Sequence, residues 1–322
     1  MDIQERISSL FENHPFAIND GAFSTQLEAM GCDINDELWS AKILYEDPAK
    51  VKAVHTQYFE AGADFSTCGS YQASVPGFMK KGFTEERSRE LIRESMRLLK
   101  KAEEEYLAEH PARAAELFVG GSCGPYGAYL ANGAEYTGDY GHSKEDRESI
   151  RHFHKERMEL LKEGGAEFFG AETIPCLWEA EMLADLAEEL GLPVWNSFSC
   201  RDGKHISDGT PIADCARALQ GRDHIIAIGI NCTHPRYISS LIREIRDAIG
   251  GEKRIIVYPN GGEDYDPVTK MWSGRYAAGN FKGLARGWIA DGADILGGCC
   301  RTTPDDIRAL SELRTEMESS GN

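Results

Sequence analysis

Two adjacent cysteines near the C-terminal end of the sequence raise the first chemical question. Cys299 and Cys300 follow Gly297 and Gly298 in the stretch LGGCCRTTPDD. Neighbouring side chains of a β-strand point to opposite faces, so two adjacent cysteines in an unbroken strand cannot share one partner. The glycine pair predicts a point where the backbone leaves strand geometry and lets both sulfur atoms face the same group.

A third cysteine, Cys232, ends the apolar run IIAIGINC. Three thiolates that leave one position open suit a catalytic zinc ion, which prefers tetrahedral sulfur ligands about 2.3 Å away. We therefore predict that Cys232, Cys299 and Cys300 bind Zn²⁺ and form the catalytic centre. Thr303 and Pro304 then signal the start of a helix, and the N-terminus of that helix would favour ionised thiols.

Other interpretations of these cysteines are open at this point. Adjacent cysteines can be buried as small apolar side chains, or they can form a strained vicinal disulfide. His234, two residues after Cys232, would complete the site if it were a fourth ligand. A site with four protein ligands is typical of structural zinc.

Eight short apolar runs predict the strands that position these residues. Most of the runs are continuously apolar, which is typical of strands buried on both faces. Amphipathic, helix-like segments separate them, and several end at a glycine, a common C-cap. Eight alternating units predict an α/β fold, a (β/α)8 TIM-type barrel that forms a single domain over residues 1–322; a doubly wound sheet is the alternative. The runs cover 16–22, 63–70, 117–124, 166–173, 193–200, 225–232, 254–261 and 293–300.

Polar side chains occur at the predicted strand ends, where a barrel carries its chemistry. Glu172 ends the run AEFFGAET, and Asp20 lies in NDGAF at the end of the first run. This position at the strand ends favours a ligand-binding role for the two carboxylates over a simple ion pair with a nearby arginine. The long segment GPYGAYLANGAEYTGDYGH predicts a functional loop over the barrel mouth. Further polar residues at or just after the strand ends are Thr67, Tyr71, Ser122 and Asn231.

The composition limits the class of partner. The chain has 322 residues and a formal net charge of −18, so we expect neither a nucleic acid nor a membrane as partner. No run approaches the roughly 18 apolar residues of a membrane span, and the N-terminal segment lacks the pattern of a signal peptide. The nine cysteines are an odd number, which indicates reduced thiols in the cytoplasm.

Several motifs together resemble the zinc-dependent homocysteine S-methyltransferases. They include DGAFSTQLEAMG, GSCGPYGAYLANGAEYTGDY, SDGTP, GINCTHP, VYPNGGEDYD and GGCCRTTPDD, and the resemblance runs from about residue 18 to residue 310. It implies a (β/α)8 barrel in which Cys232, Cys299 and Cys300 hold Zn²⁺. It also implies transfer of a methyl group from a sulfonium donor, S-methylmethionine or S-adenosylmethionine, to the thiolate of L-homocysteine, which gives methionine.

The resemblance also implies roles for the strand-end residues. Asp20 and Glu172 match acidic positions that hold the amino group of homocysteine, and Thr67 and Tyr71 match a segment that lines the amino-acid pocket. One departure is the segment DGAFSTQL, where the family often has DGAMATEL. The full predicted set of substrate-binding residues is Asp20, Glu172, Thr67, Tyr71, Ser122 and Asn231.

The expected partners are small molecules alone, namely homocysteine and the sulfonium donor. Trp39 and the tyrosines of residues 126–140 are candidates to hold the sulfonium by cation–π contact. We expect a monomer, or at most a weak homo-oligomer. A betaine-dependent homocysteine methyltransferase and a non-catalytic barrel with structural zinc are the alternative functions.

Overall fold

Eight parallel strands form one sheet that curves into a barrel. The strand order is β1-β10-β7-β6-β5-β4-β3-β2, and an isolated parallel bridge between Asn19 and Phe65 joins the two outer strands. This order follows the chain around a ring, so the (β/α)8 prediction is confirmed and the doubly wound alternative is wrong. The strands are β1 (Ala17–Ile18), β2 (Phe65–Thr67), β3 (Phe118–Cys123), β4 (Phe168–Ile174), β5 (Val194–Phe198), β6 (Ile225–Asn231), β7 (Arg254–Tyr258) and β10 (Ile295–Leu296).

This computed structural model describes residues 3–266, 271–273 and 280–320, with 264–266 and 271–273 described by their backbone only. A second, two-stranded antiparallel sheet consists of β8 (Asp264–Asp266) and β9 (Met271–Ser273), between β7 and the next helix. No sequence pattern predicted this pair. Among the described residues, no helix is long and apolar enough to cross a membrane.

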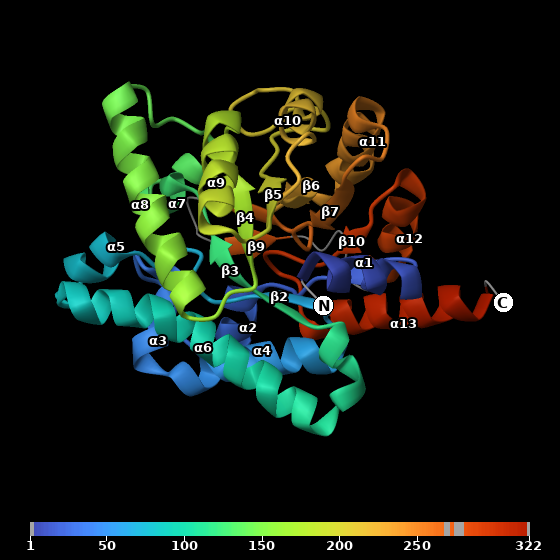
Figure 1. Cartoon of the computed structure of the whole chain (residues 1–322), viewed down its shortest axis with the longest axis horizontal. Coiled ribbons are helices and arrows are strands. Elements are labelled where there is room, and N and C mark those ends of the chain that lie inside the picture. Colours follow the sequence, from blue (N-terminus) through green and yellow to red (C-terminus); the bar gives the residue numbers. More distant parts are fainter. Residues whose placement is uncertain (1–2, 267–270, 274–279, 321–322) are drawn as a thin grey trace.

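Helices surround the strands on the outside of the ring (Figure 1). Each predicted helical segment is confirmed as a helix between consecutive strands, because its apolar face packs on the outer face of the barrel. The major helices are α4 (Pro48–Ala61), α6 (Glu85–Glu109), α8 (Lys144–Glu163), α9 (Leu177–Leu190), α10 (Ile212–Leu219), α11 (Ile238–Ile249), α12 (Phe281–Asp291) and α13 (Pro304–Ser320). Shorter helices are α2 (Phe23–Ala29), α3 (Ile43–Glu46), α5 (Val75–Lys80) and α7 (Tyr126–Leu130), with 3-10 turns η1 (Trp39–Lys42), η2 (Pro111–Ala115), η3 (Ala134–Tyr136) and η4 (Pro235–Tyr237).

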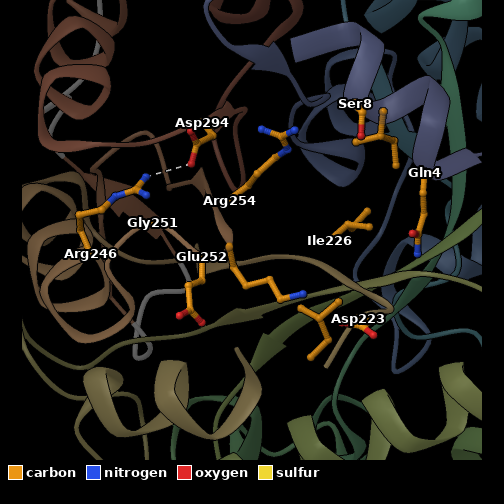
Figure 2. Close-up of a pocket in the computed structure, with 12 residues that line it drawn as sticks. Gln4, Ser8, Asp223, Ile226, Arg246, Gly251, Glu252, Arg254 and Asp294 are labelled. Atoms are coloured by element: carbon orange, nitrogen blue, oxygen red, sulfur yellow. Dashed lines mark hydrogen bonds and ion pairs between the residues drawn. The ribbon is translucent and has the colours of Figure 1, made fainter. Parts of the chain in front are cut away.

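An N-terminal helix that sequence analysis did not predict covers one end of the barrel. Ile7 and Leu10 of α1 (Ile3–Asn13) pack with Phe65, Phe118 and Trp195 in a buried cluster inside the ring. Apolar side chains therefore fill the strand starts. Figure 2 shows a pocket beside this helix, where Arg246 Nη2 donates to Asp294 Oδ2 over 3.0 Å. The opposite end, where the strands finish, is left for chemistry.

Candidate metal centre

The three predicted ligands meet at the end of the barrel where the strands finish. Cys232 directly follows β6, and Cys299 and Cys300 follow β10 after two glycines. Because β6 and β10 both border β7, their ends reach the same part of the rim. The Cys232 sulfur lies 2.7 Å from that of Cys299 and 3.7 Å from that of Cys300, and all three lie within 4.8 Å of one another. The predicted convergence is confirmed.

The geometry of the three thiols fits a tetrahedral metal ion. Around an ion with sulfur ligands about 2.3 Å away, neighbouring sulfur atoms are roughly 3.8 Å apart. The separation of Cys232 and Cys300 already matches that value, whereas Cys232 and Cys299 would have to separate by roughly 1 Å. Within the described part of the chain, these cysteines are the one group of three or more metal-ligating side chains, and His234 is not part of it. The described residues therefore leave one ligand position open.

Unusual backbone angles point the sulfur atoms toward one another. Cys232 has a φ of 48° and Arg301 a φ of 70°, both in the left-handed region that non-glycine residues rarely adopt. Hydrogen bonds hold both residues in place: the Cys232 N–H donates to the Tyr258 carbonyl over 3.3 Å, and the Arg301 N–H donates to Thr25 Oγ1 over 3.0 Å. Strain held in this way is typical of functional sites.

The glycine pair before the cysteines serves close packing. β10 ends at Leu296, so the backbone leaves the strand at the glycines as predicted. Neither glycine has a positive φ, however, so conformational freedom is not the reason for them. A Cβ on Gly297 would lie 2.7 Å from the Asp20 carbonyl oxygen, and a Cβ on Gly298 would lie 2.2 Å from Thr302 Oγ1. A side chain at Gly297 would push the cysteine segment off the end of the first strand, and a side chain at Gly298 would clash with Thr302, just before α13.

The three thiols share negative charge unevenly. The Cys299 and Cys300 thiols donate hydrogen bonds to the Cys232 sulfur, and these bonds hold the pKa of Cys232 well below its usual range. The same bonds raise the pKa of Cys299 and Cys300, because ionising a donor would break its bond and add a second negative charge. A single thiolate forms in the protein alone, and a bound dication would be needed to ionise all three.

Two buried carboxylates, Asp20 and Glu172, lie at the ends of β1 and β4. Asp20 Oδ2 accepts hydrogen bonds from Ser66 Oγ over 2.7 Å and from the Thr67 N–H over 3.0 Å. Burial nevertheless raises the pKa of Asp20 to about 8, and the nearby Glu172 charge adds to the rise. Burial raises the pKa of Glu172 to about 7, and its Oε1 has no hydrogen-bond partner. Such a pair is suited to a cationic group.

The structure brings Thr67, Ser122 and Tyr71 to the same rim. The hydroxyls of Ser122 and Thr67 hydrogen-bond the Glu172 carboxylate and partly offset the rise in its pKa. Burial, followed by the charge of Cys232, raises the pKa of Tyr71 well above its usual value. These three side chains therefore line the region between the carboxylates and the thiols, where the sequence predicted a pocket.

Asn231 has a different environment from the other predicted residues. Its Oδ1 accepts from the Thr173 N–H over 2.7 Å, and its Nδ2 donates to Thr173 Oγ1 over 2.8 Å. Thr173 has a φ of 61°, so the Asn231 amide stabilises a left-handed turn directly after Glu172. The predicted contact of Asn231 with substrate stays a prediction, since both ends of its amide are already engaged.

The loop between β3 and α8 covers the thiols, as its length predicted. The Tyr136 hydroxyl donates to Cys232 Sγ over 3.8 Å, although the tyrosine itself is 48% exposed. Trp39 packs edge-on against Tyr71, with ring centroids 6.3 Å apart. Aromatic faces from two separate loops therefore lie near the open side of the cysteine cluster.

Sequence analysis missed one acidic residue of this loop, Glu135. Its Oε2 is buried and has no hydrogen-bond partner, and the Cys232 thiolate adds to the rise that burial causes in the pKa of Glu135. The only signal in the sequence is an acid beside Tyr136 in a loop rich in glycine and tyrosine, which also contains Asp139. That pattern does not distinguish a site residue from a solvated one.

Comparisons with known proteins agree with this geometry. The family model described as homocysteine S-methyltransferase matches residues 17–314. Homocysteine S-methyltransferase YbgG of Bacillus subtilis is 45% identical over 98% of this chain and 99% of the relative, and the Escherichia coli homocysteine S-methyltransferase is 43% identical over 94% and 97%.

A solved structure shares the whole architecture. The metallated form of the homocysteine methyltransferase MmuM from Escherichia coli superimposes with a TM-score of 0.84 and 39% identity, over 95% of this chain and 99% of that one. Its oxidised form gives a TM-score of 0.83. The family model, which spans residues 17–314, includes β6 and β10 and the three cysteines that follow them. The chain therefore belongs to the homocysteine S-methyltransferase family.

Proposed function

We propose that this chain transfers a methyl group from a sulfonium donor, S-methylmethionine or S-adenosylmethionine, to the thiolate of L-homocysteine. The products are methionine and the demethylated thioether of the donor. The observation that carries the proposal is the cluster of three thiols with one open position, next to two buried carboxylates that have no cation in the described chain. The family to which the chain belongs supports the acceptor.

We infer that the metal is zinc, held by Cys232, Cys299 and Cys300. Their donor set of three sulfur atoms within 4.8 Å of one another suits zinc with a fourth, exchangeable position. When bound, zinc supplies a Lewis acid that keeps the thiol of homocysteine ionised at neutral pH. No separate general base is then required of the protein.

The two strand-end carboxylates would hold homocysteine by its ammonium group. Glu172 Oε1 lacks a hydrogen-bond donor, and an ammonium brings three N–H donors and a positive charge. Binding would ionise both carboxylates, since the cation reverses the effect of burial on their pKa. Anchoring the amino end in this way would orient the acceptor sulfur toward the thiol cluster.

The transfer itself would cancel charge. The sulfonium S–CH₃ bond breaks and its electron pair stays on the departing sulfur, while a lone pair of the homocysteine thiolate forms the new S–C bond. An anion and a cation become two neutral thioethers. Aromatic rings hold a sulfonium by cation–π contact in a site that excludes water, and we assign that role to Tyr136, Tyr71 and Trp39.

The first test measures methionine formation and zinc content on the same sample. Reduced protein is supplied with homocysteine and, in parallel, S-methylmethionine, S-adenosylmethionine or betaine. We expect about one zinc per chain and turnover with the sulfonium donors. Turnover with betaine alone would make the chain a betaine-dependent enzyme, and bound zinc without any turnover would make the metal structural.

We also propose that the enzyme acts on small molecules in the cytoplasm, as a monomer or weak homo-oligomer. The net charge of −18 disfavours a nucleic-acid partner. All nine cysteines are free thiols, which suits a reducing compartment. Fractionation of cells and sedimentation of the purified protein test these points.

A further inference from the structure

The acid on the loop over the thiols is held in a fixed place. Glu135 belongs to η3, and its carbonyl oxygen accepts from Ser199 Oγ over 3.1 Å. On the other side, a Cβ added to Gly127 would lie 2.6 Å from the Glu135 backbone nitrogen. The backbone is therefore packed from both directions, and the carboxylate is carried by a segment with little freedom to move it.

The Glu135 carboxylate has a buried oxygen without a partner. Its Oε2 accepts no hydrogen bond, and within the described part of the chain no lysine, arginine or histidine forms an ion pair with it. Burial raises the pKa of this carboxyl. A buried carboxylate oxygen without a partner is unfavourable, so its presence on the loop over the thiols calls for a hydrogen-bond donor from outside the chain.

This acid is distinct from the pair proposed to hold homocysteine. Glu172 raises the pKa of Asp20, whereas neither of these two carboxylates shifts that of Glu135. Glu135 instead lies beside Tyr136 in η3, and the Tyr136 hydroxyl donates to Cys232 Sγ over 3.8 Å, so this acid belongs to the side of the loop and the aromatic rings. The site thus has one anionic position at the strand ends and a second on the covering loop.

We propose that Glu135 binds the α-ammonium group of an amino-acid sulfonium donor and thereby selects such donors. The inference rests on the proposed function, and it assigns to this chain a residue that distinguishes among donors. The orphaned oxygen lacks a hydrogen-bond donor. An ammonium supplies N–H donors, whereas a sulfonium supplies none. The sulfonium would lie against Tyr136 and Tyr71, and the short carbon chain of the donor would join it to the ammonium group at Glu135.

This assignment predicts which donors the site rejects. A sulfonium compound without an amino group would leave Glu135 buried and unpaired, and that loss lowers binding. Betaine has a quaternary nitrogen without any N–H, so it would leave the Glu135 oxygen without a hydrogen-bond donor in the same way. S-Methylmethionine and S-adenosylmethionine both carry the required ammonium, so Glu135 favours them together against simpler methyl donors.

The test is a cycle of two proteins and two donors. S-Methylmethionine is compared with its deamino analogue, 4-(dimethylsulfonio)butanoate, on the wild-type enzyme and on Glu135→Gln. We expect the wild type to prefer S-methylmethionine by about 10- to 30-fold in kcat/KM, which corresponds to one desolvated charge pair. Glu135→Gln should reduce that preference to within about 3-fold, while the KM for homocysteine is unchanged.

A matched variant on the same loop controls for loss of charge alone. Asp139→Asn removes an acid whose side chain is 82% exposed and pairs with His142, and it should keep the donor preference of the wild type. An equal loss for both donors in Glu135→Gln, or a change confined to the homocysteine KM, would overturn the proposal.

A binding measurement separates this inference from the proposed function. Calorimetry of S-methylmethionine with the wild type and Glu135→Gln requires no turnover. Suppose that the wild type forms no methionine but binds S-methylmethionine more tightly than Glu135→Gln does. That result would support the role of Glu135 and refute the methyl transfer. Normal methionine formation by the wild type with unchanged binding to Glu135→Gln would refute only the role of Glu135.

Discussion

Two buried glutamates of the same protein, Glu172 and Glu179, have opposite surroundings. Glu179 Oε1 accepts from the Tyr126 N–H over 2.7 Å and from His154 Nε2 over 2.9 Å, and its Oε2 accepts from the Tyr140 hydroxyl. Glu172 Oε1, at the end of β4, has no partner. Both carboxylates are removed from water, yet the chain supplies partners to both oxygens of Glu179 and leaves one oxygen of Glu172 without a partner. The comparison suggests that the paired carboxylate serves the scaffold and the unpaired one serves a ligand.

The Glu179 network shows what a complete buried pairing achieves. Arg157 Nη2 donates to His154 Nδ1 over 2.8 Å and to the Gly124 carbonyl over 2.6 Å. Because Nδ1 accepts, the proton of the neutral ring is on Nε2, which donates to Glu179. A cation, a neutral imidazole and an anion are thus linked in series. Their partners Gly124 and Tyr126 lie at the start of the covering loop, so this network fixes the loop over the thiols.

The largest expected effect comes from removing a thiol. Cys299→Ser should lose bound zinc and lower the rate of methionine formation by about 1000-fold or more, because an alcohol does not replace a zinc thiolate. Its zinc-free form should unfold at the same denaturant concentration as the zinc-free wild type. Cys32→Ser, on a half-buried thiol outside the cluster, should keep both zinc and activity.

If zinc-free Cys299→Ser were less stable than the zinc-free wild type, the thiol would contribute to the stability of the fold, which contradicts its assignment to the ligand site alone. A second contradiction would be a Cys299→Ser protein that retains about one zinc per chain. Zinc content is measured by elemental analysis, and stability by urea unfolding of reduced, metal-free protein.

The next prediction is that the same substitution changes the free energy of unfolding in opposite directions at the two glutamates. Glu179→Gln should lower the free energy of unfolding by about 3 kcal/mol, because it leaves Arg157 buried without its anion. Glu172→Gln should raise the free energy of unfolding of the metal-free protein by up to about 3 kcal/mol at pH 8, since an unpaired buried charge disappears.

The sign for Glu172 follows from its pKa of about 7 in the folded chain against 4.5 for the free group. Between these values the folded chain binds more protons than the unfolded chain, so the free energy of unfolding falls as the pH rises from about 4.5 to 7. Glutamine does not titrate, so Glu172→Gln should not show this fall in the free energy of unfolding. Urea unfolding at pH 5 and pH 8 measures it, and destabilisation by Glu172→Gln at pH 8 would show that the carboxylate is paired after all.

The sequence predicted those parts of the protein that depend on local pattern. Eight apolar runs are enough to give the ring order, and the ring order brings Cys232 to the cysteine pair, since the ends of β6 and β10 flank β7. The helix start at Pro304 follows from its own residues and is confirmed.

The remaining features depend on contacts between distant segments. The packing of α1 inside the barrel, the close approach of Gly297 to Asp20, and the pairing of Asn231 with Thr173 each need a partner far away in the sequence. Glu135 and Glu179 differ for the same reason: each is an acid in a polar or amphipathic segment, and only the fold decides which one receives hydrogen-bond donors. Sequence patterns report burial and periodicity, and they are silent on which polar atoms lack a partner.

The smallest expected effect is the pH dependence of amino-acid binding at the strand ends. Methionine is the suitable ligand, because it has the ammonium of homocysteine without a thiol that titrates. With pKa values of about 8 for Asp20 and about 7 for Glu172 in the empty site, both carboxyls are largely protonated at pH 6. An ammonium needs both of them ionised, so binding at pH 6 must expel protons from both carboxyls, and the affinity should rise by roughly 100-fold by pH 8.

Calorimetry of methionine binding to the reduced, metal-free protein at pH 6, 7 and 8 measures this dependence. Glu172→Gln should bind methionine more weakly at pH 8 and show a flatter profile, because one of the two titrating groups is gone. Glu179→Gln should keep the wild-type slope, since its partners already compensate Glu179 before any ligand arrives. Identical slopes in all three proteins would mean that an unpaired buried oxygen does not identify the ligand site, and the comparison between the two glutamates would lose its functional meaning.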